Sequence, residues 1–479
     1  MATSEYTPLA KTGGLADVSA SLSAHLHRAG HDVRVLLPFY STLKLDGFDV
    51  EPVEGLQNLS LQVGPHQGSV SIDSAQRQGG GPPVYLLRCP ELYDRSGIYS
   101  RGPDEHLRFV VLSRAAIEMC QHMGFAPDIF SCHDWHTALV PLYLKSVYAW
   151  DQLFANTRSV LTIHNIGYQG VFGAGQLPDL GLGDAAHLLH QDDLQRGVIN
   201  FMKTGVLYAD CLTTVSPTYA REIQGEEYGM GLHPFLQQRG DSVVGILNGV
   251  DADWDPATDS LIPAQFDSQD LSGKRTCKQA LIKEMGLAGP VEIPLIGVVT
   301  RLVGQKGIEL MQQTLPQLLK QRDFSIAALG SGEPRYEQFF SELQATFPGR
   351  VSFYRGYNNT LAHWIEAGSD MFLMPSLYEP CGLNQMYSLK YGTVPIVRET
   401  GGLADSVEQI DPAGATGTGV LFRHYDAPGL WWAINRALDL YADRALWHKV
   451  MLNGMAQDFS WDRQVERYVE LFRQLGAQG

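Results

Sequence analysis

Histidines and a carboxylate follow two apolar runs in the first half of the chain. The motif HDWH at 133–136 comes directly after the run DIFSC, and His164 comes directly after the run SVLTI. Two histidines at spacing i, i+3 could bind a metal ion, but no cysteine or acidic partner stands at the spacing of a zinc protease. A strand-end histidine is also often a packed structural residue. Two such strand ends in one domain favour a third interpretation, a polar cleft lined by Asp134 and imidazoles.

Basic residues at one turn of the second half could hold phosphate. Arg301 and Lys306 lie in VVTRLVGQKG, after an apolar run and before a segment of helical periodicity. Charge-assisted hydrogen bonds to oxyanions are strong, so these cations form a candidate clamp that can neutralise a diphosphate leaving group. Glu379, in SLYEPCGL, follows another apolar run and lies in a turn whose backbone N–H groups could hold hydroxyls or phosphate.

The hexapeptide TGGLAD occurs twice, at 12–17 and at 400–405. A glycine pair before an apolar-periodic run predicts a turn into a helix, because glycine tolerates positive φ and lets other groups approach the backbone. The N–H groups and dipole at a helix start attract anions. Two such turns predict two domains that each direct a helix start toward one shared anionic ligand.

The elements that position these residues alternate between strand and helix. Short apolar runs separated by helix-length segments predict an α/β protein with two doubly wound, Rossmann-like domains built on parallel sheets. Ligands of such sheets bind beyond the carboxyl ends of the strands, in a cleft that the two domains would share. The predicted strands are 31–40, 128–132, 159–163, 211–215 and 243–247, then 293–300, 324–330, 351–356, 370–375 and 393–399.

The polar stretch NGVDADWDPATD marks the junction between the two domains. We therefore expect an N-terminal domain over 1–248 and a C-terminal domain over 249–458. The amphipathic segment 459–479 is expected to form a helix that packs back on the N-terminal domain.

The first strand of the N-terminal domain is missing from the pattern. A glycine turn of this kind needs a strand before it, yet residues 1–10 contain no apolar run. Residues 2–5 could be only the last residues of that central strand. We expect the natural product to begin with additional apolar residues upstream.

Composition excludes several classes of function. The 479 residues carry a formal charge of −16, which argues against broad contact with nucleic acid. No apolar run reaches the roughly 18–20 residues that span a bilayer, and the first residues do not resemble a secretory signal. The sequence therefore predicts a cytoplasmic protein without nucleic-acid or membrane partners.

Metal-binding patterns are weak. The six cysteines are scattered without a CxxC pair, which indicates reduced and mostly buried thiols. Asp251-Ala252-Asp253 matches the DxD pattern with which many sugar-nucleotide enzymes hold a divalent metal, but it lies in the expected linker. We expect no metal cofactor.

Seven motifs together resemble the bacterial glycogen synthase and plant starch synthase family, retaining glucosyltransferases of the GT-B fold. They occur in the order of that family and extend from position 11 to position 407, nearly the whole chain. KTGGLADV together with EPCGL is far more specific than a single glycine loop. The motifs are KTGGLADV, HDWH, TIHNIGYQG, ILNGVD, TRLVGQKG, SLYEPCGL and RETGGLADSV.

The resemblance implies roles for individual residues. Lys11 resembles the lysine that contacts the sugar nucleotide from the N-terminal domain, and Arg301 and Lys306 resemble the pair that binds the distal phosphate. Tyr357 resembles a residue stacked near the adenine. The residues expected around the transferred glucose are Asp134, His164 and Glu379. Together with Arg301 and Lys306 they form the expected catalytic set. The other residues expected to hold the donor, besides Lys11 and Tyr357, are Gly13, Gly14, Asn248, Cys381, Gly382, Leu383, Thr400, Gly401 and Gly402.

The implied reaction is glucosyl transfer from ADP-glucose to the non-reducing end of an α-1,4-glucan such as glycogen. Retention of configuration could follow a double displacement or a same-face route, and the resemblance favours the same-face route. A phosphorylase or a nucleotide-sugar epimerase of the same fold is one alternative, because fold does not fix function. A non-catalytic glucan-binding protein is the alternative from another class.

Overall fold

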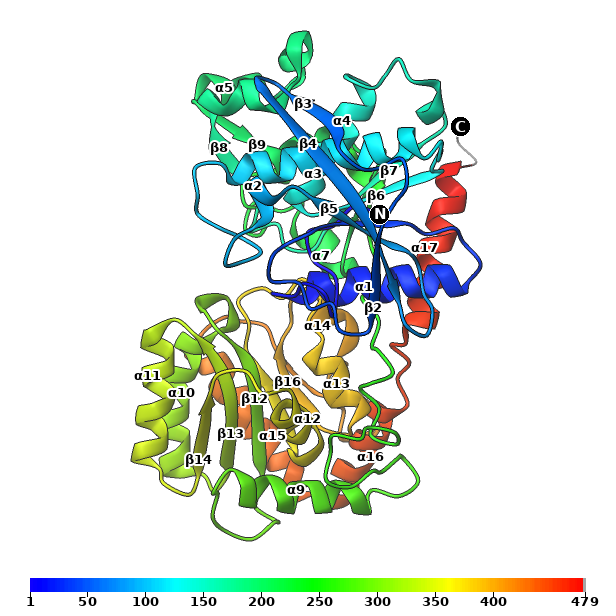
Figure 1. Ribbon diagram of the computed structural model, residues 1–479. Helices are drawn as coiled ribbons and strands as arrows, with labels where there is room; N and C mark the ends of the chain where they lie inside the picture. The colour runs from blue at the N-terminus through cyan, green and yellow to red at the C-terminus, as the bar shows by residue number, and fades with distance from the viewer. Residues whose placement is uncertain (477–479) are drawn as a thin grey trace. The chain divides into compact units, whose positions relative to one another are not determined.

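The computed structural model describes residues 1–476, and the chain divides into two compact units (Figure 1). Unit 1 contains Met1–Val215, Ala220–Gly249 and the chain from Trp461 onward. Unit 2 contains Ser216–Tyr219 and Val250–Ser460. No helix among the described residues is both long enough and apolar enough to cross a bilayer.

Unit 2 is built on a six-stranded parallel sheet with the order β14-β13-β12-β15-β16-β17. In chain order this is 3-2-1-4-5-6, the order of the dinucleotide-binding fold, and the direction of winding reverses between β12 and β15. The strands are β12 (Leu295–Leu302), β13 (Ser325–Gly332), β14 (Val351–Arg355), β15 (Met371–Met374), β16 (Val394–Arg398) and β17 (Val420–Phe422).

Alternate strand residues of unit 2 enter two different cores. Ile296 and Val298 of β12 pack with the helices that include α10, α11 and α15, whereas Leu295 packs with α9 and α12 on the opposite face. This alternation is the period of two that a pleated strand imposes. The helices are α9 (Ser272–Glu284), α10 (Ile308–Gln321), α11 (Pro334–Thr346), α12 (Asn359–Gly368), α13 (Asn384–Lys390), α14 (Gly401–Ser406), α15 (Ala427–Ala442) and α16 (Arg444–Met455), with the short 3-10 helix η6 (Gly304–Lys306).

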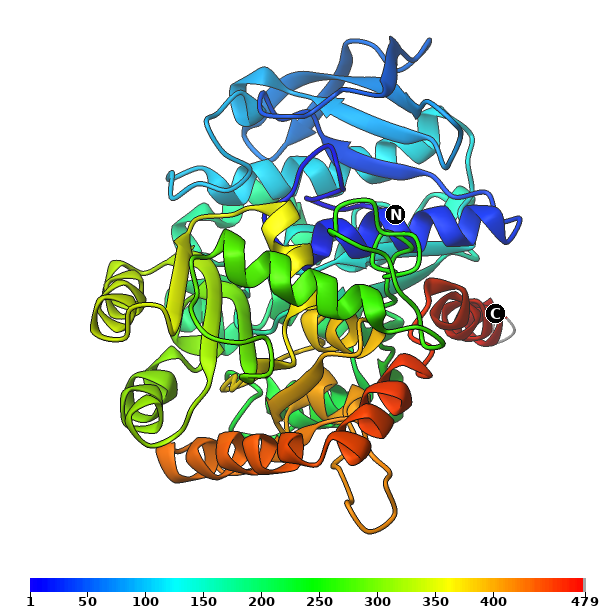
Figure 2. The same ribbon diagram turned by 90° about the horizontal axis from the view of Figure 1, so that it is seen from below.

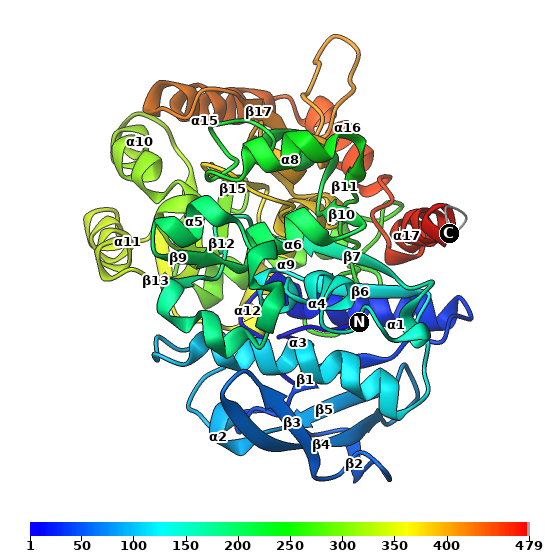
Figure 3. The same ribbon diagram turned by 90° about the horizontal axis from the view of Figure 1, so that it is seen from above.

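Unit 1 contains a parallel set and a partly antiparallel set of strands. The parallel set has the order β11-β10-β7-β6, and β1 pairs in parallel with β5. The expectation of a purely parallel sheet is wrong for 48–88, where β2, β3 and β5 all pair antiparallel with β4. Figure 3 shows α3 lying against this part of the sheet.

The strands of unit 1 are β1 (Val35–Pro38), β2 (Phe48–Pro52), β3 (Leu59–Val63), β4 (His66–Arg77), β5 (Val84–Arg88), β6 (Ile129–His133), β7 (Arg158–Ile163), β8 (Val171–Gly173), β9 (Val198–Asn200), β10 (Cys211–Thr214) and β11 (Val243–Gly245). The α-helices outside 250–460 are α1 (Gly14–Arg28), α2 (Pro90–Tyr93), α3 (Glu105–His122), α4 (Val140–Lys145), α5 (Gln191–Gln195), α6 (Phe201–Tyr208), α7 (Pro217–Glu222), α8 (His233–Arg239) and α17 (Trp461–Gly476). The 3-10 helices are η1 (Trp135–Thr137), η2 (Gln152–Phe154), η3 (Ala174–Leu180), η4 (Gly183–Leu188) and η5 (Gly240–Ser242).

The first residues of the chain lie between β1 and β6. Ala2 forms parallel bridges to Leu36 of β1 and to Cys132 of β6, and thereby links the two sets of strands. The Met1 ammonium donates to the Arg34 carbonyl at 2.8 Å. A largely apolar cavity of about 380 Å³ adjoins Met1. Residues 2–5 therefore follow the path that the end of a central strand would take between β1 and β6. The expectation about upstream residues stays a prediction.

Helix α17 belongs to unit 1 although it follows unit 2 in the sequence. Trp461 and Tyr468 of α17 are buried in one hydrophobic cluster with Val18 and Leu22 of α1. Figure 2 shows the two helices, in red and in blue, near each other. A Cβ added to Gly249 would lie 2.4 Å from the Trp461 ring, so glycine permits this close approach. The amphipathic pattern of the segment places its apolar stripe on α1.

Candidate active site

The Asp134 carboxylate connects two strand ends of unit 1. Asp134 directly follows β6, and its Oδ1 accepts the backbone N–H of His164 at 2.8 Å and that of Asn165 at 3.4 Å, both just beyond β7. Its φ of +52° is uncommon for a residue with a side chain and costs on the order of 1–3 kcal/mol. The hydrogen bonds to the neighbouring strand stabilise this geometry and fix the carboxylate at the carboxyl edge of the sheet.

Burial changes the acid–base character of Asp134. The side chain is only 7% exposed, and desolvation raises its pKa to about 7, although the amide hydrogen bonds from His164 and Asn165 oppose this shift. The negative charge of Glu5 contributes to the increase. The carboxyl group therefore exchanges its proton near neutral pH rather than near pH 4.

His164 and His133 form a hydrogen-bonded imidazole pair. His164 Nε2 lies 2.9 Å from His133 Nδ1, and His133 Nε2 lies 3.1 Å from the Ser131 hydroxyl. Burial lowers the pKa of His164 to about 3 and that of His133 well below its ordinary value, so both rings are neutral. One proton is shared between the facing nitrogens, and the tautomers of the two rings are therefore set together.

The metal interpretation of HDWH finds no ligand set. His133 is engaged by His164, whereas the His136 ring stacks on Tyr99 with centroids 4.9 Å apart. Among residues 1–476, no group of three or more histidine, cysteine, aspartate or glutamate side chains is arranged to hold a metal ion. These residues form a buried polar cluster at the carboxyl edge of the sheet.

The first TGGLAD turn leads into α1. The Lys11 ammonium is about half exposed and pairs with Asp17 of α1 at 2.7 Å. The backbone N–H groups of Thr12 and Gly13 donate to the buried carboxylate of Glu5. The sequence predicted that this helix start would attract an anion from outside, but the structure shows that a side chain of the same unit already accepts from these two groups.

The glycines of this turn are not required by positive φ. Gly13 has an extended φ of −155°, and Gly14 is the first residue of α1. A Cβ at either position would meet no atom within 4 Å. The space beside the turn is therefore open to another group, as the motif indicates.

Asn248, beyond β11, is buried, and its Oδ1 has no hydrogen-bond partner within the described part of the chain.

The predicted basic and acidic residues of unit 2 lie at or beyond the carboxyl ends of β12 and β15, the two strands at which the winding reverses. Arg301 is the second-last residue of β12 and is exposed, and it has no ion pair with any described residue. The Lys306 ammonium donates to both carboxylate oxygens of Glu379, at 2.8 and 2.7 Å. Ser376 also donates to this carboxylate at 2.9 Å. The motifs predict separate roles for Lys306 and Glu379, whereas the structure places the two residues in one ion pair.

The second TGGLAD turn is tightly packed. Gly401 has φ +44°, and a Cβ there would lie 2.0 Å from the Glu379 carbonyl oxygen. A Cβ on Gly402 would lie 2.0 Å from the Cys381 carbonyl, and the Gly402 N–H donates to the Glu379 carbonyl at 3.1 Å. These glycines hold the turn 379–382 close to the start of α14. That helix has only six residues, so the expected dipole of a long helix is absent here.

The other predicted donor-binding residues of unit 2 lie on the same carboxyl edge. Tyr357, just beyond β14, is 73% exposed, and its hydroxyl donates to Asn359 at 2.9 Å. Cys381 is buried, and Gly382 adopts φ +67°. Leu383 and Thr400 are the residues that precede α13 and α14.

Sequence reasoning missed two polar residues of unit 1, Glu5 and Tyr99. The Tyr99 hydroxyl donates to Glu5 at 2.6 Å across 94 positions of sequence. Only Glu5 had a sequence signal, since it lies directly before the glycine turn, where a strand is expected to end.

Comparisons with known proteins agree with this architecture. The model of the starch synthase catalytic domain matches residues 1–238, and that of glycosyl transferases group 1 matches residues 287–449. The chain is 42% identical to the glycogen synthase of Anaeromyxobacter sp. (strain Fw109-5), with 99% of this chain and 98% of that protein covered. It is also 42% identical to glycogen synthase 1 of Geobacter sulfurreducens, with 98% and 95% covered.

Solved structures extend the comparison. The catalytic domain of starch synthase IV from Arabidopsis thaliana, bound to ADP and acarbose, superposes with a TM-score of 0.90 at 36% identity and covers 99% of this chain and 98% of that one. A sucrose-phosphate synthase from Thermosynechococcus elongatus, at 19% identity and a TM-score of 0.60, shares the fold. The sheet orders, the motif positions and these full-length matches confirm the GT-B fold and show that the chain belongs to the glycogen synthase and starch synthase family of glycosyltransferases.

Proposed function

We propose that the protein transfers glucose from ADP-glucose to the non-reducing end of an α-1,4-glucan, with retention of configuration. The observation that carries the proposal is the group at the reversal point of unit 2, where Arg301 is exposed and Lys306 contacts Glu379. The reversal point of a doubly wound sheet is where nucleotide ligands bind. The ADP and acarbose bound to the Arabidopsis starch synthase support this donor and this acceptor.

Arg301 and Lys306 would stabilise the charge that grows on the departing diphosphate. Lys306 is already oriented, because Glu379 accepts from its ammonium with both oxygens. A diphosphate carries more negative charge than one carboxylate and can share this ammonium. Oriented charges of this kind lower the barrier because they need no rearrangement during the reaction. Lys11 is proposed to contact the diphosphate from unit 1 after its ammonium leaves Asp17.

Asp134, His164 and Asn248 would hold the transferred glucose through its hydroxyl groups. Asp134 retains Oδ2 and His164 retains Nδ1 beyond the contacts described above, and Asn248 Oδ1 is an unpaired buried acceptor. The neutral state of His164 suits contact with a hydroxyl. The remaining donor-binding residues are proposed from their positions on the carboxyl edges: Gly13, Gly14, Tyr357, Cys381, Gly382, Leu383, Thr400, Gly401 and Gly402.

We favour the same-face route for the transfer. In this route the bond from the anomeric carbon to the diphosphate oxygen breaks, the acceptor 4-hydroxyl oxygen bonds to the same face, and its proton passes to the departing phosphate. Glu379 is an unsuitable nucleophile while both of its oxygens accept from Lys306. The diphosphate is therefore the base in this proposal.

A donor assay tests the function. The purified chain is incubated with glycogen and either ADP-glucose or UDP-glucose, and nucleotide release is measured together with glucan length. Release of ADP with an elongated glucan is expected. Release of glucose 1-phosphate from glycogen and phosphate would indicate a phosphorylase, conversion of the sugar without transfer would indicate an epimerase, and glucan binding without turnover would indicate a binding protein.

The chain is also proposed to need no divalent metal, because the cations assigned to the diphosphate are protein side chains. We expect unchanged ADP release in excess EDTA. Loss of activity in EDTA, with recovery on addition of Mg²⁺ or Mn²⁺, would contradict this prediction and would make Asp251 and Asp253 candidate ligands.

A further inference from the structure

Glu5 is a buried carboxylate at the carboxyl end of the N-terminal segment. Its side chain is 3% exposed and lies against the first TGGLAD turn. Glu5 Oε2 accepts the backbone N–H groups of Thr12 at 2.6 Å and of Gly13 at 3.0 Å. A single oxygen therefore fixes two consecutive peptide groups directly after Lys11.

The second oxygen of Glu5 connects this turn to a distant loop. Glu5 Oε1 accepts the Thr12 hydroxyl at 2.6 Å and the Tyr99 hydroxyl at 2.6 Å. The Tyr99 hydroxyl also lies 3.0 Å from the Ser4 hydroxyl, and its ring stacks on His136. Tyr99 therefore supplies a donor whose position is set by contacts outside the turn.

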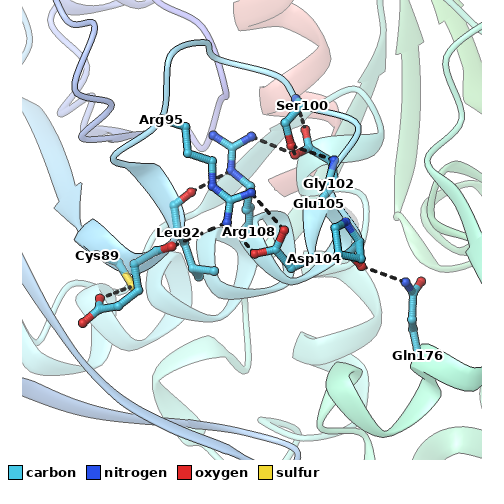
Figure 4. Close-up of polar contacts among 11 residues, drawn as sticks. Cys89, Leu92, Arg95, Ser100, Gly102, Asp104, Glu105, Arg108 and Gln176 are labelled. Atoms are coloured by element: carbon cyan, nitrogen blue, oxygen red, sulfur yellow. Dashed lines mark hydrogen bonds and ion pairs between the residues drawn. The ribbon is translucent and has the colours of Figure 1, made fainter.

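Ion pairs and hydrogen bonds hold the loop 95–104, which includes Tyr99 in the sequence, and Figure 4 shows those of Arg95, Ser100 and Glu105. The Arg95 guanidinium donates to Asp104 across the loop. The Ser100 backbone and hydroxyl groups both donate to Glu105, which is paired with the buried Arg108 at 2.8 Å. These ion pairs lie before and after Tyr99 in the sequence, so they hold the phenol in place for Glu5.

The charge of Glu5 is not balanced by a nearby ion pair. No described basic side chain lies within salt-bridge distance of Glu5, and Lys11 instead pairs with Asp17. A buried carboxylate without a cation is costly unless hydrogen bonds replace its hydration. A glutamine of the same shape would avoid this cost, but it has only one acceptor oxygen, whereas four donors converge on Glu5: the N–H groups of Thr12 and Gly13 and the hydroxyls of Thr12 and Tyr99. The glutamine oxygen could accept from one of these pairs, and its NH2 group would then face the other pair of donors. An acceptor-only side chain is therefore the group that satisfies all four donors.

We propose that Glu5 is a positioning residue for Lys11, which it serves by fixing the backbone of the turn 11–14 against the Tyr99 loop. The inference rests on the proposed function, in which the Lys11 ammonium contacts the diphosphate of the donor. Glu5 itself touches no donor atom in this proposal. The turn holds the lysine backbone still, so that only its flexible side chain moves from Asp17 to phosphate.

A double-mutant cycle with Glu5→Gln and Lys11→Ala tests this role. We expect Glu5→Gln to lower kcat/KM for ADP-glucose by about 10-fold or more, the typical effect of lost charge-assisted hydrogen bonds, with KM for glycogen unchanged. In the Lys11→Ala background the same change should cost less than about 3-fold, because coupled residues are not additive. Tyr99→Phe, which removes one of the donors to Glu5, should give a smaller loss that also disappears in that background.

Glu118→Gln is the matched control, since Glu118 also accepts from a tyrosine hydroxyl, that of Tyr148 at 2.7 Å. It should leave the kinetics unchanged. Full activity of Glu5→Gln, or an equal loss with and without Lys11, would overturn the positioning role.

Hydrogen exchange gives a readout that does not depend on the reaction. The amides of Thr12 and Gly13 should exchange faster in Glu5→Ala, which removes both acceptor oxygens, than in the unmodified chain, whereas those of α3 should not change. Unchanged exchange at 12–13 would overturn the inference even if activity fell. If the unmodified chain released no nucleotide from ADP-glucose, the proposed function would fail, and the exchange experiment would still decide whether Glu5 orders the turn.

Discussion

At the scale of single residues, one hexapeptide serves two different physical purposes. Gly13 and Gly14 leave open space beside the first turn, whereas Gly401 and Gly402 allow the second turn to pack directly against the backbone of 379–382. The sequence pattern predicts a turn into a helix in both places. It cannot distinguish open space from close packing, because that depends on which other loop approaches the turn.

This difference predicts opposite results for alanine substitutions. Gly401→Ala should lower the free energy of unfolding by about 1–3 kcal/mol or more, because its Cβ would overlap a carbonyl oxygen and its φ is positive. Gly14→Ala should leave stability unchanged or raise it by up to about 1 kcal/mol, since alanine favours a helix and meets no atom. Urea unfolding measures both. Equal destabilisation by the two substitutions would contradict the distinction.

Lys306→Ala tests the proposed phosphate contact. We expect kcat to fall by on the order of 100-fold, the typical effect of removing one oriented electrostatic group. Lys320→Ala, an exposed lysine at the end of α10, is the control and should not change the rate. The substitution also leaves Glu379 without its partner, so the melting temperature must be measured alongside. Near-normal turnover by a folded variant would remove Lys306 from the proposed mechanism.

Asp134 should make a measurable contribution to the pH dependence of stability. Its pKa is raised from its ordinary value of 3.8 to about 7, so the folded state binds its proton more tightly than the unfolded state does. Its contribution to stability therefore falls as pH rises from about 4 to about 7, by roughly 4 kcal/mol in all, and is constant above that range.

The lowered pKa values of His133 and His164 act in the opposite direction, because these rings are protonated more readily in the unfolded state and their contribution rises with pH up to about 6.5. The effect of Asp134 is therefore isolated by comparison with Asp134→Asn. The stability of the asparagine variant relative to the unmodified chain should increase between pH 4 and pH 7. A difference that does not change with pH would show that Asp134 is ionised throughout this range.

At the scale of elements, the sequence predicts those whose apolar pattern is continuous. The parallel strands that precede the site motifs are short apolar runs, and each was predicted within a few residues of its observed position. Strands β2 to β5 are absent from the predicted set. Near its centre β4 alternates apolar and polar residues instead of forming a continuous apolar run, whereas β5, VYLLR, is a continuous apolar run that the prediction omitted. A search for alternation around Val70 and Ile72 would have found β4.

The same contrast applies to the candidate site. Residues that follow an apolar run, such as Asp134 and Glu379, can be placed at a sheet edge from sequence alone. Pairings between loops cannot, since the Lys306–Glu379 contact spans 73 positions and the Glu5–Tyr99 contact spans 94. Nothing in the local pattern of either partner indicates which distant loop it meets.

At the scale of the whole molecule, unit 1 depends on a helix from the far end of the sequence. Trp461, Val465 and Tyr468 of α17 bury their side chains in a core shared with α1. Burial of each large apolar side chain contributes about 1.5–3 kcal/mol, and a domain is stable by about 5–15 kcal/mol in total. Removal of α17 therefore takes away a large fraction of the stability of unit 1.

We expect a chain ending at residue 460 to lose the cooperative unfolding of unit 1 while unit 2 unfolds as before. Calorimetry on the shortened chain and on the full chain measures this difference. Trp461→Ala should give a milder form of the same defect, with a loss of about 3–5 kcal/mol. If both unfolding transitions were unchanged in the shortened chain, packing of α17 on α1 would not be needed for the stability of unit 1.

The position of α17 also sets the order of events on the ribosome. Domains of most proteins fold from the N-terminus as they are synthesised, at about 5–20 residues per second. Here the domain that is translated first cannot close its core until Trp461 and the residues after it have emerged, by which time residues 250–460 are complete. The apolar face of α1 is therefore exposed for about 20 to 90 seconds of synthesis at that rate. This interval is when the nascent chain most needs a chaperone to cover α1.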